Sequence, residues 1–322
     1  MEKSKLAFIC RKGLETFIEP IVQQFEKFEE YQVRRYYVQT QGEIIAAIKW
    51  ADKVLLEWAN ETAVFATQVY DLKKKGVIVR LHSYESLIAP GGNSILPQQI
   101  DWTVVDYLVF VAPHIKEIIK GRMTDIDDRV ETRIIPNGLD IDKIIPNKEL
   151  NMYDIAYVCN ISHKKEPALA LQIMAELVKL NPAFRLHVAG QFQDERYELY
   201  MKHMIKEMGI ADNIIFYGFV SDMDTFWQGK GAILSTSIHE GHPMNIMEGA
   251  ARGLLPVVHN FYGAKELYPA TWLFNTVQEA VDSIFNHIPF ENYRQYIIDR
   301  GWTIANQVTE LKKLVEQTGG QE

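Results

Sequence analysis

The chain has 322 residues, of which 47% are hydrophobic and 24% charged, and its 34 Lys and Arg against 42 Asp and Glu give a formal net charge of −8. The acidic balance argues against a general nucleic-acid binder, and no apolar run reaches the roughly 18 residues of a membrane-spanning helix. The apolar run after the first five residues is too short for the core of a secretory signal peptide. Cys10 and Cys159 make no disulfide framework, and no Cys/His cluster has zinc spacing. The length predicts two domains, at about 100–200 residues each.

The first half of the chain alternates short apolar runs with helical stretches. The expected strands are 5–10, 33–38, 53–57, 77–81, 107–111 and 133–136, and the expected helices are 14–28, 41–50, 63–75 and 113–121. Strands that alternate with helices over short loops predict a parallel sheet with helices on both faces.

The same pattern begins again after the polar stretch 146–151. The expected strands are then 154–158, 184–188, 213–217, 231–235 and 255–259, and the expected helices are 167–180, 195–208 and 244–252, with a helical tail over 291–317. The sequence therefore predicts an α/β protein with two doubly wound domains in tandem. Because ligands of such sheets bind beyond the carboxyl ends of the strands, we expect a site in a cleft between the domains.

The segment 235–258 is the most informative part of the sequence. A strand ends there, a loop with Gly and Pro turns, and a helix begins near Met244. Backbone N–H groups at the start of a helix suit anions and sugar hydroxyls. Glu240 lies in the loop and Glu248 about one turn into the helix, so both can face one cleft. Taken singly, each has a simpler explanation, Glu240 as a helix cap and Glu248 as a solvated helix residue.

The whole segment resembles the signature of retaining glycosyltransferases of family 4. The matching residues are Glu240, Gly241, His242, Pro243, Glu248, Gly249, Ala250, Ala251, Gly253, Pro256, Val257 and Val258. Three further stretches resemble motifs of that family: the junction motif at 135–140, the strand before the donor-binding glycine loop at 186–190, and a strand and turn at 214–220. The resemblance is specific over residues 133–310 and weaker over 1–132.

The resemblance implies a GT-B fold, with two Rossmann-like doubly wound parallel-sheet domains facing a central cleft. The domains would be an acceptor-side domain (1–146), a nucleotide-sugar-binding domain (147–290) and C-terminal helices (291–322) that cross back to the first domain. The implied activity moves a hexose from a UDP- or GDP-linked nucleotide sugar to a hydroxyl of a sugar-containing or lipid-linked acceptor, with retention of configuration. The protein would be cytoplasmic, with at most peripheral membrane contact and no nucleic-acid partner.

No metal cofactor is expected for this reaction. Asp-x-Asp, which holds a divalent metal in the other large glycosyltransferase fold, occurs at 125–127, 140–142 and 222–224. All three lie at expected turns or helix starts, where Asp caps helices.

The resemblance also implies residue roles. Glu248 would hydrogen-bond the ribose hydroxyls, and Glu240 would hold the donor sugar and help to stabilise its developing positive charge. Lys165 would stabilise the leaving diphosphate without a metal, although a solvated lysine beside Lys164 is an equal alternative. The remaining donor-binding positions are Gly241, His242, Pro243, Met244, Asn245, Asn160, Gly190 and Gly13.

Two positions near Lys165 depart from the family pattern. Asn160 stands where the family usually has an arginine on the diphosphate, and Glu166 stands where it has a glycine. An asparagine donates a hydrogen bond but carries no charge. Either His163 or Lys164 compensates, or the donor binds differently, or activity is weak. The alternative function is a catalytically weak or inactive GT-B protein that acts as a sugar- or nucleotide-binding or interaction module.

The first domain offers fewer candidates. His82 follows the strand 77–81, where the family places a histidine near the reacting sugar, but Ser83 replaces the aspartate that follows it. Gly13 is the one glycine left in a turn that is glycine-rich in relatives, and Arg11 and Lys12 precede it. These two cations either supply the missing positive charge or are simply exposed. A nicotinamide-dependent dehydrogenase is disfavoured because no Gly-x-Gly-x-x-Gly follows an expected strand.

Overall fold

The computed structural model describes residues 3–89, 92–287 and 292–319. Parts of the expected domains, residues 1–2, 90–91, 288–291 and 320–322, lie outside the described residues. The chain divides into two compact units, Met1–Asp140 with Gly301–Glu322 (the first unit) and Ile141–Arg300 (the second unit). Each unit is built on its own parallel sheet, as the sequence predicts.

The first unit contains a six-stranded sheet in the order β2-β1-β3-β4-β5-β6. Its strands are β1 (Ser4–Arg11), β2 (Tyr31–Val38), β3 (Lys53–Glu57), β4 (Gly76–Leu81), β5 (Tyr107–Phe110) and β6 (Glu131–Ile134). Its helices are α1 (Glu19–Phe25), α2 (Gln41–Trp50), α3 (Glu61–Thr67), α4 (Pro113–Lys120), α5 (Ile126–Arg129) and α13 (Ile304–Gln317). The order changes direction between β1 and β3, as in other doubly wound sheets.

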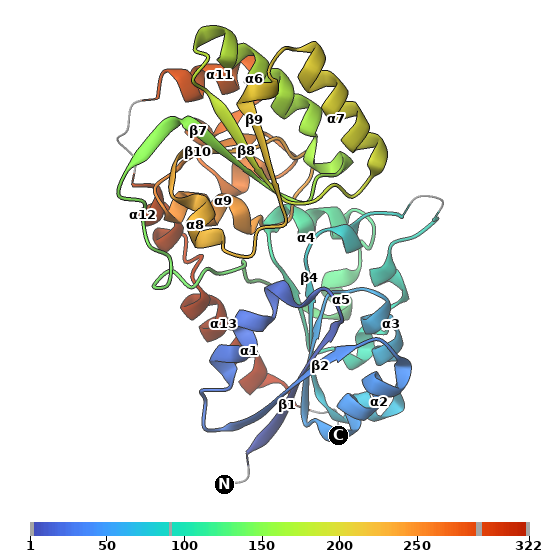
Figure 1. Cartoon of the computed structure of the whole chain (residues 1–322). Coiled ribbons are helices and arrows are strands. Elements are labelled where there is room, and N and C mark those ends of the chain that lie inside the picture. Colours follow the sequence, from blue (N-terminus) through green and yellow to red (C-terminus); the bar gives the residue numbers. More distant parts are fainter. Residues whose placement is uncertain (1–2, 90–91, 288–291, 320–322) are drawn as a thin grey trace. The chain divides into compact units, whose positions relative to one another are not determined.

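Helices cover both faces of the first sheet. Figure 1 shows α1 and α13 on one side and α2 and α3 on the other. α13 belongs to this layer because it has an apolar stripe, Ile304, Val308, Leu311 and Val315, at helical spacing. The stripe lies in one core cluster with Phe8 of β1. Since both faces are covered, all six residues of β4 are buried.

The second unit contains a six-stranded sheet in the order β12-β11-β10-β7-β8-β9. Its strands are β7 (Leu150–Val158), β8 (Arg185–Ala189), β9 (Ile214–Gly218), β10 (Gly229–Ser235), β11 (Leu255–His259) and β12 (Leu273–Phe274). Its helices are α6 (Pro167–Leu180), α7 (Glu195–Glu207), α8 (Met223–Trp227), α9 (Met244–Ala251), α10 (Ala264–Leu267), α11 (Val277–Phe285) and α12 (Tyr293–Asp299).

Three expected helices are wrong in extent. The stretch 14–28 contains a short 3-10 turn and then α1, with Pro20 in the first helical turn, where proline is tolerated. The stretch 63–75 covers most of α3, which begins at Glu61 with Asn60 as its cap, and a separate 3-10 turn. The described part of the expected tail helix, 292–317, contains two helices, because Thr303 caps a new helix start through the backbone N–H of Asn306.

The expected elements do not include α5, α8, α10, α11 and β12. α11 had a readable signal, since Thr276 and Glu279 form a capping box in the Ser/Thr-x-x-Glu pattern. Across the part of the chain that the structure describes, no helix combines the length and the apolar character needed to cross a membrane.

Candidate functional site

In the second unit, the candidate donor residues follow the ends of neighbouring strands. Asn160 comes after β7, Gly190 after β8, and the loop 236–243 after β10. Because these strands are parallel and adjacent, their carboxyl ends meet at one edge of the sheet. The order of strands therefore brings together residues that are far apart in the sequence.

Glu240 and Lys165 form the centre of this edge. The Lys165 ammonium donates a hydrogen bond to Glu240 Oε1, and the Lys164 Nζ lies 3.1 Å from Oε2. The Glu240 side chain is 7% exposed, that of Lys165 18% and that of Lys164 41%. One buried carboxylate thus holds two cations that retain access to solvent.

The backbone holds Lys165 in place. Its carbonyl oxygen accepts hydrogen bonds from the hydroxyls of Tyr157 and Thr236, each at 2.7 Å. The Ile238 N–H donates to the Lys164 carbonyl oxygen at 2.9 Å. The turn that carries both lysines is therefore fixed to the end of β7 and to the loop after β10.

The two lysines keep Glu240 ionised. Burial opposes the charge, but the charges of Lys165 and Lys164 outweigh it and lower the pKa of Glu240 to about 2. Burial also disfavours the ammonium of Lys165, yet the carboxylate of Glu240 raises its pKa above the usual value. Both members of the pair are therefore charged at neutral pH.

The start of α9 completes this edge. The interpretation of Glu240 as a helix cap is wrong: the capping position is Pro243, no side chain caps the helix, and Glu240 bonds the lysines instead. The Asn245 side-chain amide donates to the Val158 carbonyl oxygen at 2.8 Å and so ties α9 to β7. Gly241, His242 and Pro243 are buried in the loop, and Met244 begins the helix.

Glu248 lies one turn into α9 and is half-buried rather than solvated. Burial raises its pKa, and the charge of Arg252 offsets part of this effect. On the same helix, Gly249 packs so closely on Ile233 of β10 that a Cβ atom would lie 2.7 Å from that side chain. Glycine at this position lets α9 approach the sheet.

The turns after β7 and β8 contact each other through Gly190. A Cβ atom on Gly190 would lie 1.8 Å from the Cys159 carbonyl oxygen, and its φ is +139°. A side chain is therefore excluded here. The neighbouring Asn160 is exposed and uncharged. His163 and Lys164 are the two residues proposed to compensate for the missing charge at Asn160. The Nδ1 of His163 lies 2.9 Å from the hydroxyl of Tyr197, and Lys164 is paired with Glu240.

In the first unit, His82 belongs to a buried charged network. Its Nε2 donates to Glu57 Oε1 at 2.7 Å, and the Arg80 Nη1 donates to both oxygens of the same carboxylate at 2.8 Å. The Arg80 Nη2 donates to Asn137 Oδ1 at 3.0 Å. The charges of Arg80 and His82 overcome the effect of burial and lower the pKa of Glu57.

Glu85 and Trp58 fix the backbone and the ring of His82. The Glu85 carboxylate accepts hydrogen bonds from the N–H groups of His82 and Ser83 at 3.2 and 3.0 Å. Trp58 stacks on the imidazole with ring centroids 3.9 Å apart, and Phe17 lies 4.9 Å away. Trp58 adopts a φ of 76°, which is strained for a tryptophan.

Glu57, Arg80 and Glu85 were missed from the sequence. A readable signal existed for two of them, since Glu57 and Arg80 are opposite charges inside apolar strands and are direct partners in the β3–β4 register. Gly13 lies in an open turn with a φ of +94°, where a Cβ atom would meet nothing within 4 Å. The described ranges contain no group of three or more His, Cys, Asp or Glu side chains that is arranged to hold a metal ion.

Part of the chain matches a known protein family. Residues 140–270 match the family model described as glycosyl transferases group 1. Over these residues the chain is similar to group 1 glycosyl transferases. The matched region contains Lys165, Glu240, Glu248, Asn160 and Gly190, whereas His82 and Gly13 lie outside it.

A curated protein to which part of this chain is similar is the alpha-monoglucosyldiacylglycerol synthase of Streptococcus pneumoniae. It is 24% identical over 187 residues, which make up 52% of this chain and 42% of the relative. The chain therefore spans less than half of the length of that protein.

Solved structures establish the fold of the whole chain. Anabaena HepE in complex with UDP superposes with a TM-score of 0.78 at 14% identity, over 97% of this chain and 99% of that protein. The pneumococcal O-GlcNAc transferase GtfA in complex with UDP and GlcNAc gives 0.69 at 16% identity, over 86% and 60%. With its two parallel six-stranded sheets, the chain has the GT-B fold of these solved structures.

Proposed function

We propose that the chain is a retaining glycosyltransferase that moves a hexose from a nucleotide sugar to an acceptor hydroxyl without a metal cofactor. The observation that carries the proposal is the Lys165–Glu240 pair beside the start of α9, within the residues that match the group 1 glycosyl transferases. A cytoplasmic location is part of the proposal and agrees with two cysteines that are both free thiols.

The two lysines supply the charge that a departing nucleoside diphosphate needs. Lys164 and Lys165 converge on one carboxylate and keep partial access to solvent. A diphosphate that enters beside them gains two cations already held in place, and a fixed positive charge stabilises a leaving group without reorganisation. This arrangement compensates for the missing charge at Asn160.

Glu240 and Glu248 take different roles in the proposal. Glu240 is ionised and held by the lysines, so it is suited to stabilise positive charge that develops on the donor sugar. Glu248 is half-buried on α9 and would accept hydrogen bonds from the ribose hydroxyls. In the proposed mechanism the acceptor attacks from the side of the leaving group, and the diphosphate helps to remove the acceptor proton.

Nucleotide binding tests the proposal directly. We expect UDP, the nucleotide in the HepE and GtfA complexes, to bind in calorimetry, and Glu248→Ala to weaken it by about tenfold through loss of the ribose hydrogen bonds. GDP serves as the competing nucleotide. Glu207→Ala, an exposed glutamate on α7, is the matched control and should leave the affinity unchanged. Equal UDP affinity in the Glu248→Ala protein would contradict the assignment.

Transfer and its stereochemistry need separate measurements. NMR of the product should show that the anomeric configuration of the donor is kept, and turnover should persist in EDTA. An inverted product would exclude the retaining mechanism, and loss of turnover in EDTA would exclude metal independence.

A second candidate function is a sugar- or nucleotide-binding module without catalysis. It is favoured by the uncharged and exposed Asn160 at the position of an expected arginine. This candidate predicts that UDP raises the melting temperature while a panel of UDP- and GDP-sugars shows neither hydrolysis nor transfer.

A further inference from the structure

A pocket of about 560 Å³ opens on the first unit where β1 and β2 end. Its volume lies within the range of small-ligand sites, about 300–1,000 Å³. It is at the same edge of the sheet as His82, which follows β4, because all strands of the sheet are parallel. None of the residues with a role in the proposed function lines this pocket.

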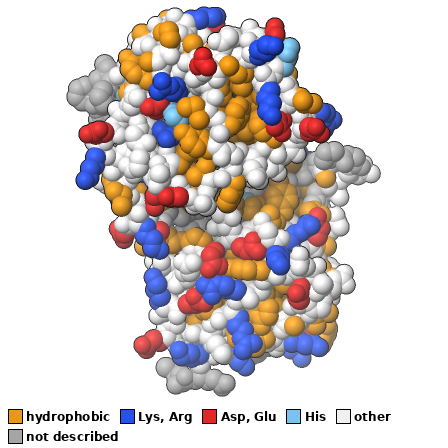
Figure 2. All heavy atoms as spheres, in the orientation of Figure 1, with side chains coloured by type: hydrophobic (Ala, Val, Ile, Leu, Met, Phe, Trp, Pro, Cys, Tyr) orange, Lys and Arg blue, Asp and Glu red, His pale blue; other side chains and the backbone are white. Residues whose placement is uncertain are grey.

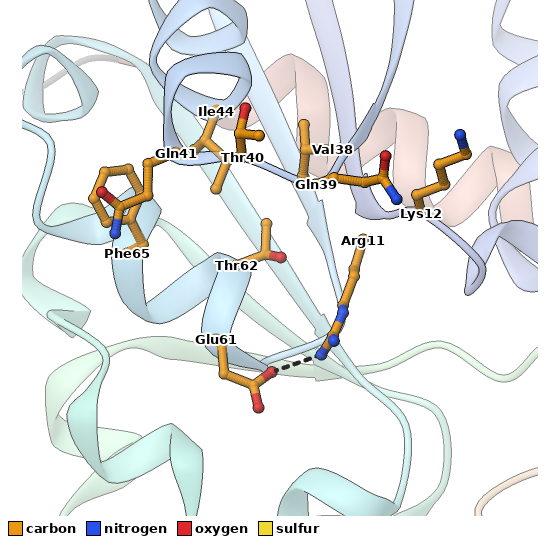
Figure 3. Close-up of a pocket in the computed structure, with 10 residues that line it drawn as sticks. All are labelled: Arg11, Lys12, Val38, Gln39, Thr40, Gln41, Ile44, Glu61, Thr62 and Phe65. Carbon is orange, nitrogen blue, oxygen red and sulfur yellow. Dashed lines mark ion pairs between the residues drawn. The ribbon is translucent and has the colours of Figure 1, made fainter.

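The pocket combines an apolar floor with a polar rim. Val38 and Ile44 are buried in the floor, and the half-buried ring of Phe65 lies beside them. In the view of Figure 3, Gln41 and Phe65 lie on one side of the pocket and Gln39 on the other. Most of the lining residues are polar or charged, which suits a ligand rich in hydroxyl groups better than an apolar one.

Two amide side chains on the rim are available to a ligand. In the described part of the chain, the side chains of Gln39 and Gln41 make no hydrogen bond to another residue, and both are exposed. A primary amide offers donors and an acceptor, as a hydroxyl group does. Ligand hydroxyls can therefore donate hydrogen bonds to both amides or accept hydrogen bonds from them.

Basic and acidic side chains lie near each other around the pocket. The Arg11 guanidinium lies 3.6 Å from the carboxylate of Glu61, and Figure 3 shows this pair at one edge of the pocket. The Glu43 carboxylate accepts the backbone N–H groups of Gln39 and Thr40 at 2.7 and 2.9 Å. These backbone hydrogen bonds, and in smaller part the charge of Lys12, lower the pKa of Glu43. Arg11 is thus paired with Glu61, and the charge of Lys12 is offset in part by Glu43.

This balance disfavours an anionic ligand. The first turn of α2, where an anion would otherwise be stabilised, already contains the carboxylate of Glu43 in a capping box with Thr40. An anion would also have to displace Glu61 from Arg11. The face of the first unit visible in Figure 2 agrees, because Lys and Arg side chains are interspersed with Asp and Glu rather than gathered by sign.

We propose that this pocket binds a neutral saccharide, whose hydroxyls bond the amides of Gln39 and Gln41 and whose apolar ring face packs on Phe65. This proposal rests on the proposed function in one respect, because it takes the saccharide to be part of the acceptor of the transferase. The acceptor would then be uncharged and rich in hydroxyl groups, and the pocket would not recognise it through a phosphate or a carboxylate.

Saturation-transfer NMR on the full chain tests the pocket without turnover. The probes are the neutral disaccharides maltose, cellobiose and lactose, compared with glucose 6-phosphate and inorganic phosphate. We expect at least one neutral disaccharide to bind more tightly than both anions. The Gln39→Ala/Gln41→Ala variant should weaken that binding by about tenfold or more, since two hydrogen bonds are lost, and Phe65→Leu should weaken it several-fold.

Gln32→Ala is the matched control, because Gln32 is an exposed glutamine on the same strand, β2, outside the pocket. It should bind the disaccharide as the parent does. The proposal is overturned if no neutral disaccharide binds, if the double variant binds as well as Gln32→Ala, or if an anion binds more tightly and Arg11→Ala abolishes its binding.

The same samples separate this proposal from the proposed function. UDP binding that depends on Glu248, together with no pocket-dependent saccharide binding, would overturn only the pocket. Pocket-dependent saccharide binding in a chain that binds neither UDP nor GDP would overturn only the transferase assignment.

Discussion

Glu57 in the first unit and Glu240 in the second are both buried carboxylates that bond basic side chains, but their partners differ. Glu57 and Arg80 are both 0% exposed, whereas the lysines that hold Glu240 are 18% and 41% exposed. A guanidinium is planar and fixes its hydrogen bonds in direction, while an ammonium is a compact charge on a flexible stem. We infer that the Glu57 pair is structural and that the Glu240 lysines can share their charge with a ligand.

The largest expected effect comes from breaking the arginine pair. Arg80→Met leaves the Glu57 carboxylate buried with His82 alone, which should lower the free energy of unfolding by about 3–5 kcal/mol. Urea denaturation measures the change. The Glu57→Gln/Arg80→Met double variant leaves no uncompensated charge and should lose less than Arg80→Met. A loss below about 1 kcal/mol for Arg80→Met would contradict a structural role for the pair.

The lysine pair should appear in the pH dependence of stability. The pKa of Glu240 is lowered from 4.5 to about 2, so the pair stabilises the fold at neutral pH and loses this contribution as the pH falls from about 4.5 to 2. The loss should be on the order of 3 kcal/mol. We expect the advantage of the parent over Glu240→Gln, measured by urea denaturation, to shrink over this range.

The Glu240→Gln/Lys165→Met variant provides the control for that titration. With both charges of the pair removed, it should lack the component of the pH dependence that belongs to the pair. If the double variant retains the same pH dependence as the parent between pH 4.5 and 2, other carboxylates cause it.

The affinity for UDP should distinguish the two lysines. Lys165→Ala removes the more buried charge and should weaken UDP binding by about tenfold, and Lys164→Ala should weaken it by about threefold, because exposed charges are better screened. Calorimetry at two salt concentrations measures both. Lys206→Ala, an exposed lysine on α7, should leave UDP binding unchanged. A larger loss of UDP affinity for Lys164→Ala than for Lys165→Ala would contradict the proposal that Lys165 is the main diphosphate contact.

The smallest expected effect concerns the turn after β1. Gly13 has a φ of +94° but open space around its Cα, so Gly13→Ala should cost only about 1 kcal/mol through backbone strain. Its thermal melting temperature should fall by a few degrees. The neighbouring Lys12→Ala, which changes no backbone requirement, should melt like the parent. An effect as large as that of Arg80→Met would show that the turn contacts more than solvent.

Local patterns were enough for most of the sheet strands and for several helices. α2 and α6 begin and end at the expected residues, because each has an apolar face and a clear start, Thr40 with Glu43 in one case and Pro167 in the other. The tail was harder to divide, since its first helix, α12, is short and the break depends on a cap at Thr303. Short elements such as α8 and β12 carry too few residues for a readable period.

The chain's own sequence determined the alternation of strands and helices and the α/β class, and it indicated the candidate segment around Glu240 and Glu248. Only the tertiary structure decided which charges meet: Lys165 with Glu240, and Arg80 with Glu57 and His82. The reason is physical. Local periodicity records which face of an element is buried, whereas the partner of a buried charge is set by strand order and register, which join residues far apart in the sequence.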